Sequence, residues 1–241
     1  MRSEYVFDDG GMNLLSSRAL LQIREFVART VAGCWLLVPC GSSPEPDTAD
    51  NQQPATSNSP ATLFVFRSGR KNIFAAGADM AEMQRFSAWD AYEFARLGQE
   101  TFDAIERLPC VTVALIDGDC FGGALDLILA FDLRFATPRS RFSHPGAKLG
   151  IVTGFGGTSR WRKVLSRPAA NQLFLANRVL SASEAQELGL VDRVAESHED
   201  ELARLESVDA RLVKELSLHS DRLSRSDLLL MARRLGAIYC G

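Results

Sequence analysis

The 241-residue sequence predicts an α/β fold. Two short apolar runs, at 63–66 and 111–116, are typical of buried strands, and stretches with helical spacing follow each of them. Strands that alternate with helices along a chain indicate a sheet covered by helices. The composition, with 46% hydrophobic and 24% charged residues, supplies enough apolar side chains for a sizeable core.

The first expected element is a helix over 16–31, because Leu20, Ile23, Val27 and Val31 recur with helical spacing. A second helix is marked by its cap: Ser181 stands three residues before Glu184, as in a capping box, and a glycine ends the segment. The other expected elements are strands over 63–66, 111–116 and 133–136, and helices over 89–107, from 124 onward and near 160–165.

The chain divides into an expected core over 1–195 and a C-terminal helical region over 196–241. Within the core, the tract 40–61 contains four prolines and three acidic residues but no lysine, arginine or aromatic residue. Such a composition buries too little apolar surface to offset the entropy lost on ordering. We therefore expect a disordered insertion at 40–61 rather than a domain boundary.

The charge pattern excludes several classes of partner. The net charge is −3 and there is no basic run, so neither nucleic acid nor an anionic membrane surface is expected as a partner. No apolar stretch approaches the ~20 residues that span a bilayer. Five scattered cysteines without a CxxC pair, and three histidines, favour reduced thiols in a cytoplasmic protein without a metal site or separate cofactor.

Two segments of small residues are candidates for chemistry. One is Ala75–Asp79, which follows a strand, and the other is Gly122–Asp126, where a strand passes into a helix. Small residues let a ligand approach the backbone, and free N–H groups at the start of a helix attract negative charge. A carbonyl oxygen held between the two segments would be polarised, which is the requirement for an oxyanion hole. The alternative is purely structural, with glycines for tight packing and Asp126 facing the helix dipole. The chain lacks a P-loop and a GxSxG elbow.

Three stretches resemble the enoyl-CoA hydratase/isomerase (crotonase) family. FRSGRKNIFAAGADMAEM at 66–83 is similar to the family's SGxGxxFxAGADxxEM segment, and IDGDCFGGALDLILAFDLRFAT at 116–137 to its NGxxxGGGxELALACDxRxA segment. The stretch 149–194, which begins LGIVTGFGGTSR, matches the family's long segment from LGxxPGxGGTQR to GLVxxV. Asn13-Leu14-Leu15 also resembles the family's early Asn-Ala-Leu.

This resemblance implies a crotonase-like spiral of ββα units with a C-terminal helical trimerisation region, assembled as a homotrimer or a dimer of trimers. It implies an acyl-CoA thioester as substrate, with CoA as part of the substrate. The backbone N–H groups of Ala78 and Gly123 correspond to the oxyanion donors, and Asp126 to the family's first catalytic glutamate. The residues expected to contact CoA are Ala76, Gly77, Ala78, Asp79, Met80, Gly122, Gly123 and Lys71.

One departure from the family pattern affects the reaction. The family's second catalytic glutamate falls in a Gln-Pro-Glu triplet, which here is His144-Pro145-Gly146, so that carboxylate is absent. Hydration normally uses two carboxylates, whereas one can move a proton between two carbons, so isomerisation is favoured over hydration. Decarboxylation of a malonyl-type thioester and a non-catalytic acyl-CoA-binding role remain alternatives.

His144 is a further catalytic candidate. It stands two residues before the vacant position, and an imidazole there can supply a proton or bind a substrate carboxylate. The structural alternative is a loop histidine outside the pocket. Thr153 and Arg160 are placed similarly in the sequence, with weaker support.

Overall fold

The computed structural model describes residues 1–33, 61–208, 210, 213–214 and 217. The expected insertion at 40–61, apart from Ala61, lies outside the described residues, and so does most of the expected C-terminal helical region at 196–241. The boundary between the two expected regions, at 195, therefore stays a prediction. Among the described residues, no helix is both long enough and apolar enough to cross a membrane.

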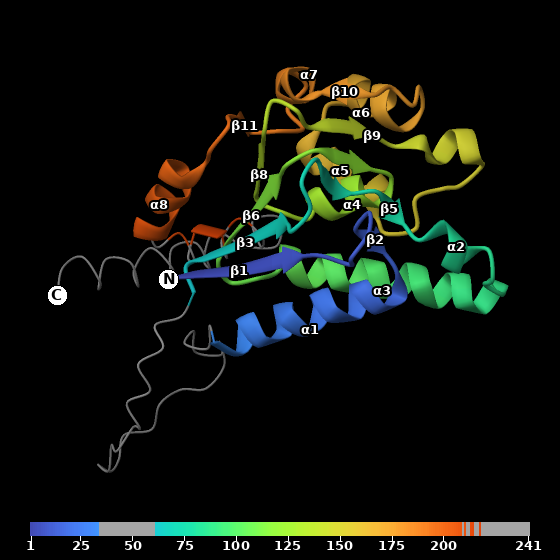
Figure 1. Cartoon of the computed structure of the whole chain (residues 1–241), viewed down its shortest axis with the longest axis horizontal. Coiled ribbons are helices and arrows are strands. Elements are labelled where there is room, and N and C mark those ends of the chain that lie inside the picture. Colours follow the sequence, from blue (N-terminus) through green and yellow to red (C-terminus); the bar gives the residue numbers. More distant parts are fainter. Residues whose placement is uncertain (34–60, 209, 211–212, 215–216, 218–241) are drawn as a thin grey trace, which may run out of the picture.

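The main sheet has five strands, all parallel, in the order β1-β3-β6-β8-β11 (Figure 1). Three of these strands coincide with the strands expected at 63–66, 111–116 and 133–136, which confirms those predictions. The strands are β1 (Arg2–Phe7), β3 (Leu63–Ser68), β6 (Val111–Ile116), β8 (Leu133–Ala136) and β11 (Arg193–Val194).

The two faces of this sheet belong to different parts of the core. Side chains alternate along a strand, so Phe64 and Phe66 face one way while Leu63 and Val65 face the other. The phenylalanines pack in the large cluster that includes the apolar stripe of α1 (Ser17–Gly33), and α3 (Ala88–Glu106) packs beside α1 (Figure 1). The opposite face is covered by α8 (Glu199–Ser207), whose Leu202 is buried there.

Shorter strands form a second, four-stranded sheet in the order β10-β9-β7-β4 and a two-stranded sheet, β2-β5. Along the chain, a strand of the main sheet is followed by one or two short strands of the other sheets and then by a helix, which confirms the predicted repetition of ββα units. The short strands are β2 (Leu14–Leu15), β4 (Ile73–Ala75), β5 (Gly77–Ala78), β7 (Asp119–Phe121), β9 (Arg141–Ser143) and β10 (Leu180–Ser181).

The remaining helices are short and begin at positions that the sequence marks clearly. The capping box at Ser181 and Glu184 is present, and two other helices begin at glycines. These elements are α2 (Met80–Met83), α4 (Gly123–Ile128), the 3-10 turn at Pro145–Leu149, α5 (Gly157–Val164), α6 (Arg167–Phe174) and α7 (Ala182–Glu187).

Asn13 fixes the N-terminal segment against the strands that carry the site. It is fully buried with a left-handed φ of 54°, which asparagine tolerates better than most residues. Its side-chain amide donates hydrogen bonds to the carbonyl of Phe7 at 2.9 Å, the hydroxyl of Ser68 at 2.8 Å and the carbonyl of Phe74 at 3.1 Å. The chain then enters β2, which pairs with β5 and so positions Ala78.

Candidate active site

The candidate site is a cavity of about 340 Å³, a size typical of small-molecule pockets. Its walls come from four parts of the chain: the segment 76–86, the first half of α3, the beginning of α4, and the segment 144–155. Most of the lining is apolar, and Asp126 is the only carboxylate among the described residues that line it. Asp126 and His144 are therefore the titratable pair on which acid–base chemistry in this cavity would depend.

The two small-residue segments meet at the cavity. A Cβ on Gly77 would lie 2.8 Å from the carbonyl oxygen of Phe121 and 3.1 Å from the amide nitrogen of Gly123, so only glycine permits this approach. Gly77 also has a φ of +97°, which other residues rarely adopt. The segment from Gly77 to Ala78 is thereby held directly against the first residue of α4.

The backbone amides of Ala78 and Gly123 can act on one ligand atom. The N–H of Asp79 donates to the carbonyl of Leu15 at 3.4 Å, and successive N–H groups of an extended chain face opposite sides, so that of Ala78 faces away from β2. Gly123 opens α4, where N–H groups have no partner within the helix. The Cβ position of Gly123 lies 3.5 Å from the nitrogen of Ala78, which makes the two amides neighbours.

Asp126 lies three residues into the same helix and is completely buried. Burial raises the pKa of its carboxyl to about 7, and this effect outweighs the hydrogen bond from Thr153, the charge of Arg160 and the backbone amide of Phe155, which lower the pKa. The Thr153 hydroxyl bonds Oδ2, while Oδ1 has no hydrogen-bond partner among the described residues. A carboxyl with these properties can both accept and return a proton near neutral pH.

The turn 153–157 is held in place around this carboxyl. A Cβ on Gly157 would lie 1.8 Å from Oδ1 of Asp126, so a glycine is required there. Arg160, nearly buried, donates to the carbonyl of Phe155 at 2.8 Å and forms ion pairs with Asp103 and Glu106 of α3. Arg160 therefore acts behind the site rather than in it.

His144 lines the cavity, which rules out the alternative of a loop histidine outside the pocket. Its side chain is 7% exposed, and its Nε2 atom lies 3.8 Å from Oδ1 of Asp126. Burial lowers the pKa of the imidazole below its ordinary value, and a hydrogen bond to its own backbone counteracts this only in part, so the neutral form predominates at pH 7.

Gly146, the position that lacks a carboxylate, also lies in the cavity wall. A Cβ there would lie 2.8 Å from the carbonyl oxygen of Ile151 and 2.9 Å from Cε1 of His144. The local packing therefore leaves no room for a side chain at this position.

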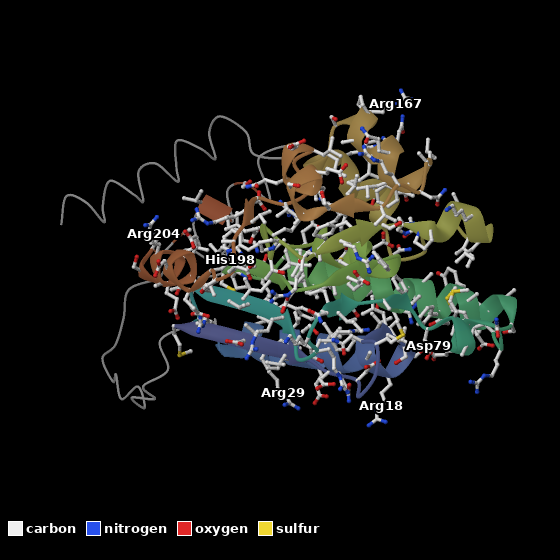
Figure 2. The ribbon with its side chains drawn as sticks, turned by 45° about the horizontal axis from the view of Figure 1, so that its top comes forward. Arg18, Arg29, Asp79, Arg167, His198 and Arg204 are labelled. Atoms are coloured by element: carbon white, nitrogen blue, oxygen red, sulfur yellow. The ribbon has the colours of Figure 1, made fainter. Side chains whose placement is uncertain are left out.

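Six of the eight residues expected to contact CoA line the cavity, and two do not. Asp79 instead caps α2, accepting hydrogen bonds from the amides of Ala81 at 2.9 Å and Glu82 at 3.0 Å, so it orders the loop behind Ala78 (Figure 2). Lys71 is exposed, lies outside the cavity lining, and acts electrostatically on Asp117. The six that line the cavity are Ala76, Gly77, Ala78, Met80, Gly122 and Gly123.

Sequence reasoning did not single out most of the apolar cavity wall, nor two residues that shape the site, Phe155 and Gly157. Phe155 forms part of the cavity wall and packs edge-on against two other rings, with 5.1 Å between its ring centroid and that of Phe94 and 5.6 Å to that of Phe102. Gly157 makes room for Asp126. Both lie in the glycine-rich run 154–157, and such a run is a sequence signal for a close approach to another group. No cluster of three or more metal-ligating side chains occurs within the described part of the chain.

Two adjacent backbone amides, a buried carboxyl on the same helix and a framework of ββα units together indicate a crotonase-fold protein. A sequence model described as enoyl-CoA hydratase/isomerase matches residues 55–226. A crotonyl-CoA hydratase from Syntrophomonas wolfei is 33% identical over 222 residues, which cover 92% of this chain and 75% of that protein. The chain belongs to the enoyl-CoA hydratase/isomerase family.

Further similarities agree with the family. A short-chain-enoyl-CoA hydratase from Clostridium acetobutylicum is 35% identical, over 59% of this chain and about half (55%) of that protein. A solved enoyl-CoA hydratase from Thermoplasma volcanium superposes with a TM-score of 0.78 at 21% identity, over 99% of this chain and 89% of that one. One from Bacillus anthracis superposes with a TM-score of 0.77 at 22% identity, over 97% and 84%. These structures support the fold alone.

Proposed function

We propose that the protein is an isomerase that shifts the carbon–carbon double bond of an enoyl-CoA thioester. The observation that carries this proposal is that Asp126 is the single carboxyl among the described residues of the cavity wall. It lies on the helix that begins at Gly123, and the packing at Gly146 leaves no room for a second carboxylate there. Hydration normally shares the orientation of water and the delivery of a proton between two carboxylates, whereas isomerisation only moves one proton between two carbons.

The amides of Ala78 and Gly123 would hold the thioester oxygen. When Asp126 removes a proton from C2 of a 3-enoyl thioester, the C2–H electron pair moves towards the carbonyl and places negative charge on that oxygen, forming a dienolate. Two N–H donors in a water-poor cavity stabilise this charge strongly. Return of a proton to C4 then places the double bond between C2 and C3, and no atom is gained or lost.

The electrostatics of Asp126 suit this reversible transfer. Its pKa of about 7 provides both a carboxylate that can take the proton and an acid that can return it. The family resemblance and the similarity to hydratases that act on CoA thioesters support the substrate class. We also propose a homotrimer or a dimer of trimers, on the family resemblance.

A second candidate is decarboxylation of a malonyl-type thioester. The apolar wall, which includes Met83, Phe86 and Phe94, supports it because a dry surface removes water from a substrate carboxylate. Loss of CO₂ would leave its bonding electrons on C2 as an enolate, held by the same two amides and then protonated. This route does not require Asp126 as a base.

The direct test is incubation of 3-enoyl, 2-enoyl and malonyl-type CoA thioesters with the enzyme in D₂O, followed by mass spectrometry. Isomerisation predicts a shifted double bond, and Asp126→Asn is expected to slow the reaction by roughly 10²-fold or more. Asp119→Asn is the matched control, because this carboxylate of β7 pairs with Arg141 instead. Full turnover by Asp126→Asn with release of CO₂ would favour decarboxylation, and binding without turnover would favour a non-catalytic role.

A further inference from the structure

The cavity brings together Asp126 and His144, and a reaction with one carboxylate gives no role to His144 or to the unpaired oxygen of Asp126. Nε2 of His144 lies 3.8 Å from Oδ1 of Asp126, and Oδ1 is buried without a hydrogen-bond partner among the described residues. The other carboxylate oxygen, Oδ2, already accepts the Thr153 hydroxyl. A buried oxygen without a hydrogen-bond partner destabilises the fold unless a ligand or a small rearrangement provides one. The nitrogen of His144 opposite Oδ1 is a candidate for that partner.

The imidazole is held in this position by its surroundings. Its ring packs against Phe174 of α6 with 4.9 Å between ring centroids. On another side it occupies the space that a side chain at residue 146 would enter, with Cε1 2.9 Å from the Cβ position of Gly146. The glycine that removes one acid–base group therefore makes room for another.

We infer that His144 is the second acid–base group of the reaction, receiving from Asp126 the proton taken from C2 and delivering it to C4. This inference rests on the proposed isomerase function. The carboxylate takes the C2 proton and becomes neutral while the dienolate forms. The proton passes from the carboxyl to Nε2, giving an imidazolium beside a carboxylate. The imidazolium then protonates C4, and both groups return to their starting states.

The distance between the two groups is compatible with this relay. At 3.8 Å the pair is too long for a hydrogen bond, but catalytic hydrogen bonds often tighten only when substrate is bound. The aspartate side chain is short, so its carboxyl alone can contact only a small part of the substrate. With His144 beside it, the proton can be delivered to a carbon that the carboxyl of Asp126 does not contact. Asp126 can thus remove the proton from C2 while Nε2 of His144 delivers it to C4.

Few other charges face the pair. Arg160 of α5 lowers the pKa of Asp126, and Cys120 of β7 is buried with its thiol pKa raised well above the ordinary value, partly by Asp126. The thiol therefore stays neutral at pH 7. The contact from α6 is the apolar ring of Phe174. In this setting, one mobile proton is shared between Asp126 and His144.

The test compares His144→Gln and His144→Phe with wild type, measuring two rates on a 3-enoyl-CoA in D₂O: deuterium uptake at C2 and the shift of the double bond. His198→Gln is the matched control, because His198 is also buried but bonds the carbonyl of Ala136 and stacks on Phe135. Figure 2 shows it beside α8, at the far end of the molecule from Asp79.

If the relay operates, both His144 variants lose the double-bond shift by roughly 10²-fold while uptake at C2 persists, since Asp126 still removes that proton. Asp126→Asn loses both rates, and His198→Gln keeps both. Two results overturn the relay while leaving the isomerase intact: His144 variants that shift the double bond at the wild-type rate, or that lose both rates in parallel. A wild-type enzyme that neither exchanges nor shifts any thioester would overturn the proposed function and the relay together.

Discussion

At the scale of single residues, the properties of the site are set by how Asp126 is buried. The same helix start that places its carboxyl next to the paired amides also removes it from water, and desolvation favours the neutral form. Thr153 opposes this effect with one hydrogen bond to Oδ2. Small changes around the carboxyl should therefore change the pH dependence of the reaction as much as its maximal rate.

Replacement of Thr153 by valine tests this directly. The hydroxyl bond lowers the pKa of Asp126, so its loss raises that pKa and moves the acid limb of the kcat/KM profile to higher pH. A shift of one unit reduces the carboxylate fraction on that limb about tenfold, while the plateau at high pH changes little. Thr153→Ser keeps the hydroxyl and should retain the wild-type profile. A Thr153→Val profile that coincides with wild type would show that this bond does not tune the base.

The raised pKa also predicts how stability depends on pH. Because the folded-state pKa of about 7 lies above the ordinary value of 3.8, the folded protein binds more protons than the unfolded chain between these values. The contribution of Asp126 to stability is fully present below pH 4 and is lost as the pH rises through 7. Asp126→Asn should therefore raise the melting temperature at pH 8 relative to wild type, and change it much less at pH 4. An equal effect at both pH values would contradict the assigned shift.

At the scale of elements, the site depends on a few close approaches between segments that are distant in the sequence. Loop 76–78 meets the start of α4 through Gly77, and the turn 153–157 meets α4 through Gly157. Arg160 ties that turn to α3 through the carbonyl of Phe155 and through Asp103 and Glu106. α4 and α5 are short, with six and eight residues, so these contacts determine the geometry.

Arg160→Met should loosen the turn without removing any group that touches substrate. Loss of charged hydrogen bonds from a buried guanidinium is expected to destabilise the fold by about 2 kcal/mol. Arg160 also lowers the pKa of Asp126, so the acid limb of kcat/KM should move to higher pH, which a purely structural loss would not cause. Arg162→Met, on the same helix but packed over Trp161, is the control. An Arg160→Met enzyme with wild-type stability and pH profile would refute this role.

At the scale of the whole molecule, the sequence predicted the buried elements and missed those at the edges. The strands at 63–66 and 111–116 were predictable because they are apolar runs, and the strand at 133–136 is apolar except for Arg134. β1 was not predicted because five of its six residues are partly or fully exposed. Its place in the sheet comes from pairing with β3, in which Arg2 lies opposite Leu63, 61 residues further along the chain. The two- and three-residue strands have no periodicity to detect.

The site was predictable to a similar extent, and for similar reasons. The roles considered for Ala78, Gly123 and Asp126 depended on local motifs, and the structure brings these residues together. The supporting contacts of Phe155 and Gly157, and the placement of His144 against Phe174, depend on the packing of distant segments, which single-sequence patterns do not contain.

The most direct test of the central claim is the fate of a 3-enoyl-CoA and a 2-enoyl-CoA incubated with the wild-type enzyme in D₂O and followed by mass spectrometry. One carboxyl beside two amides, with no room for a second carboxylate at Gly146, predicts a shifted double bond with deuterium incorporated from solvent and no gain of water. Accumulation of a 3-hydroxyacyl-CoA would contradict the account, because it would show that the cavity activates water without the second carboxylate.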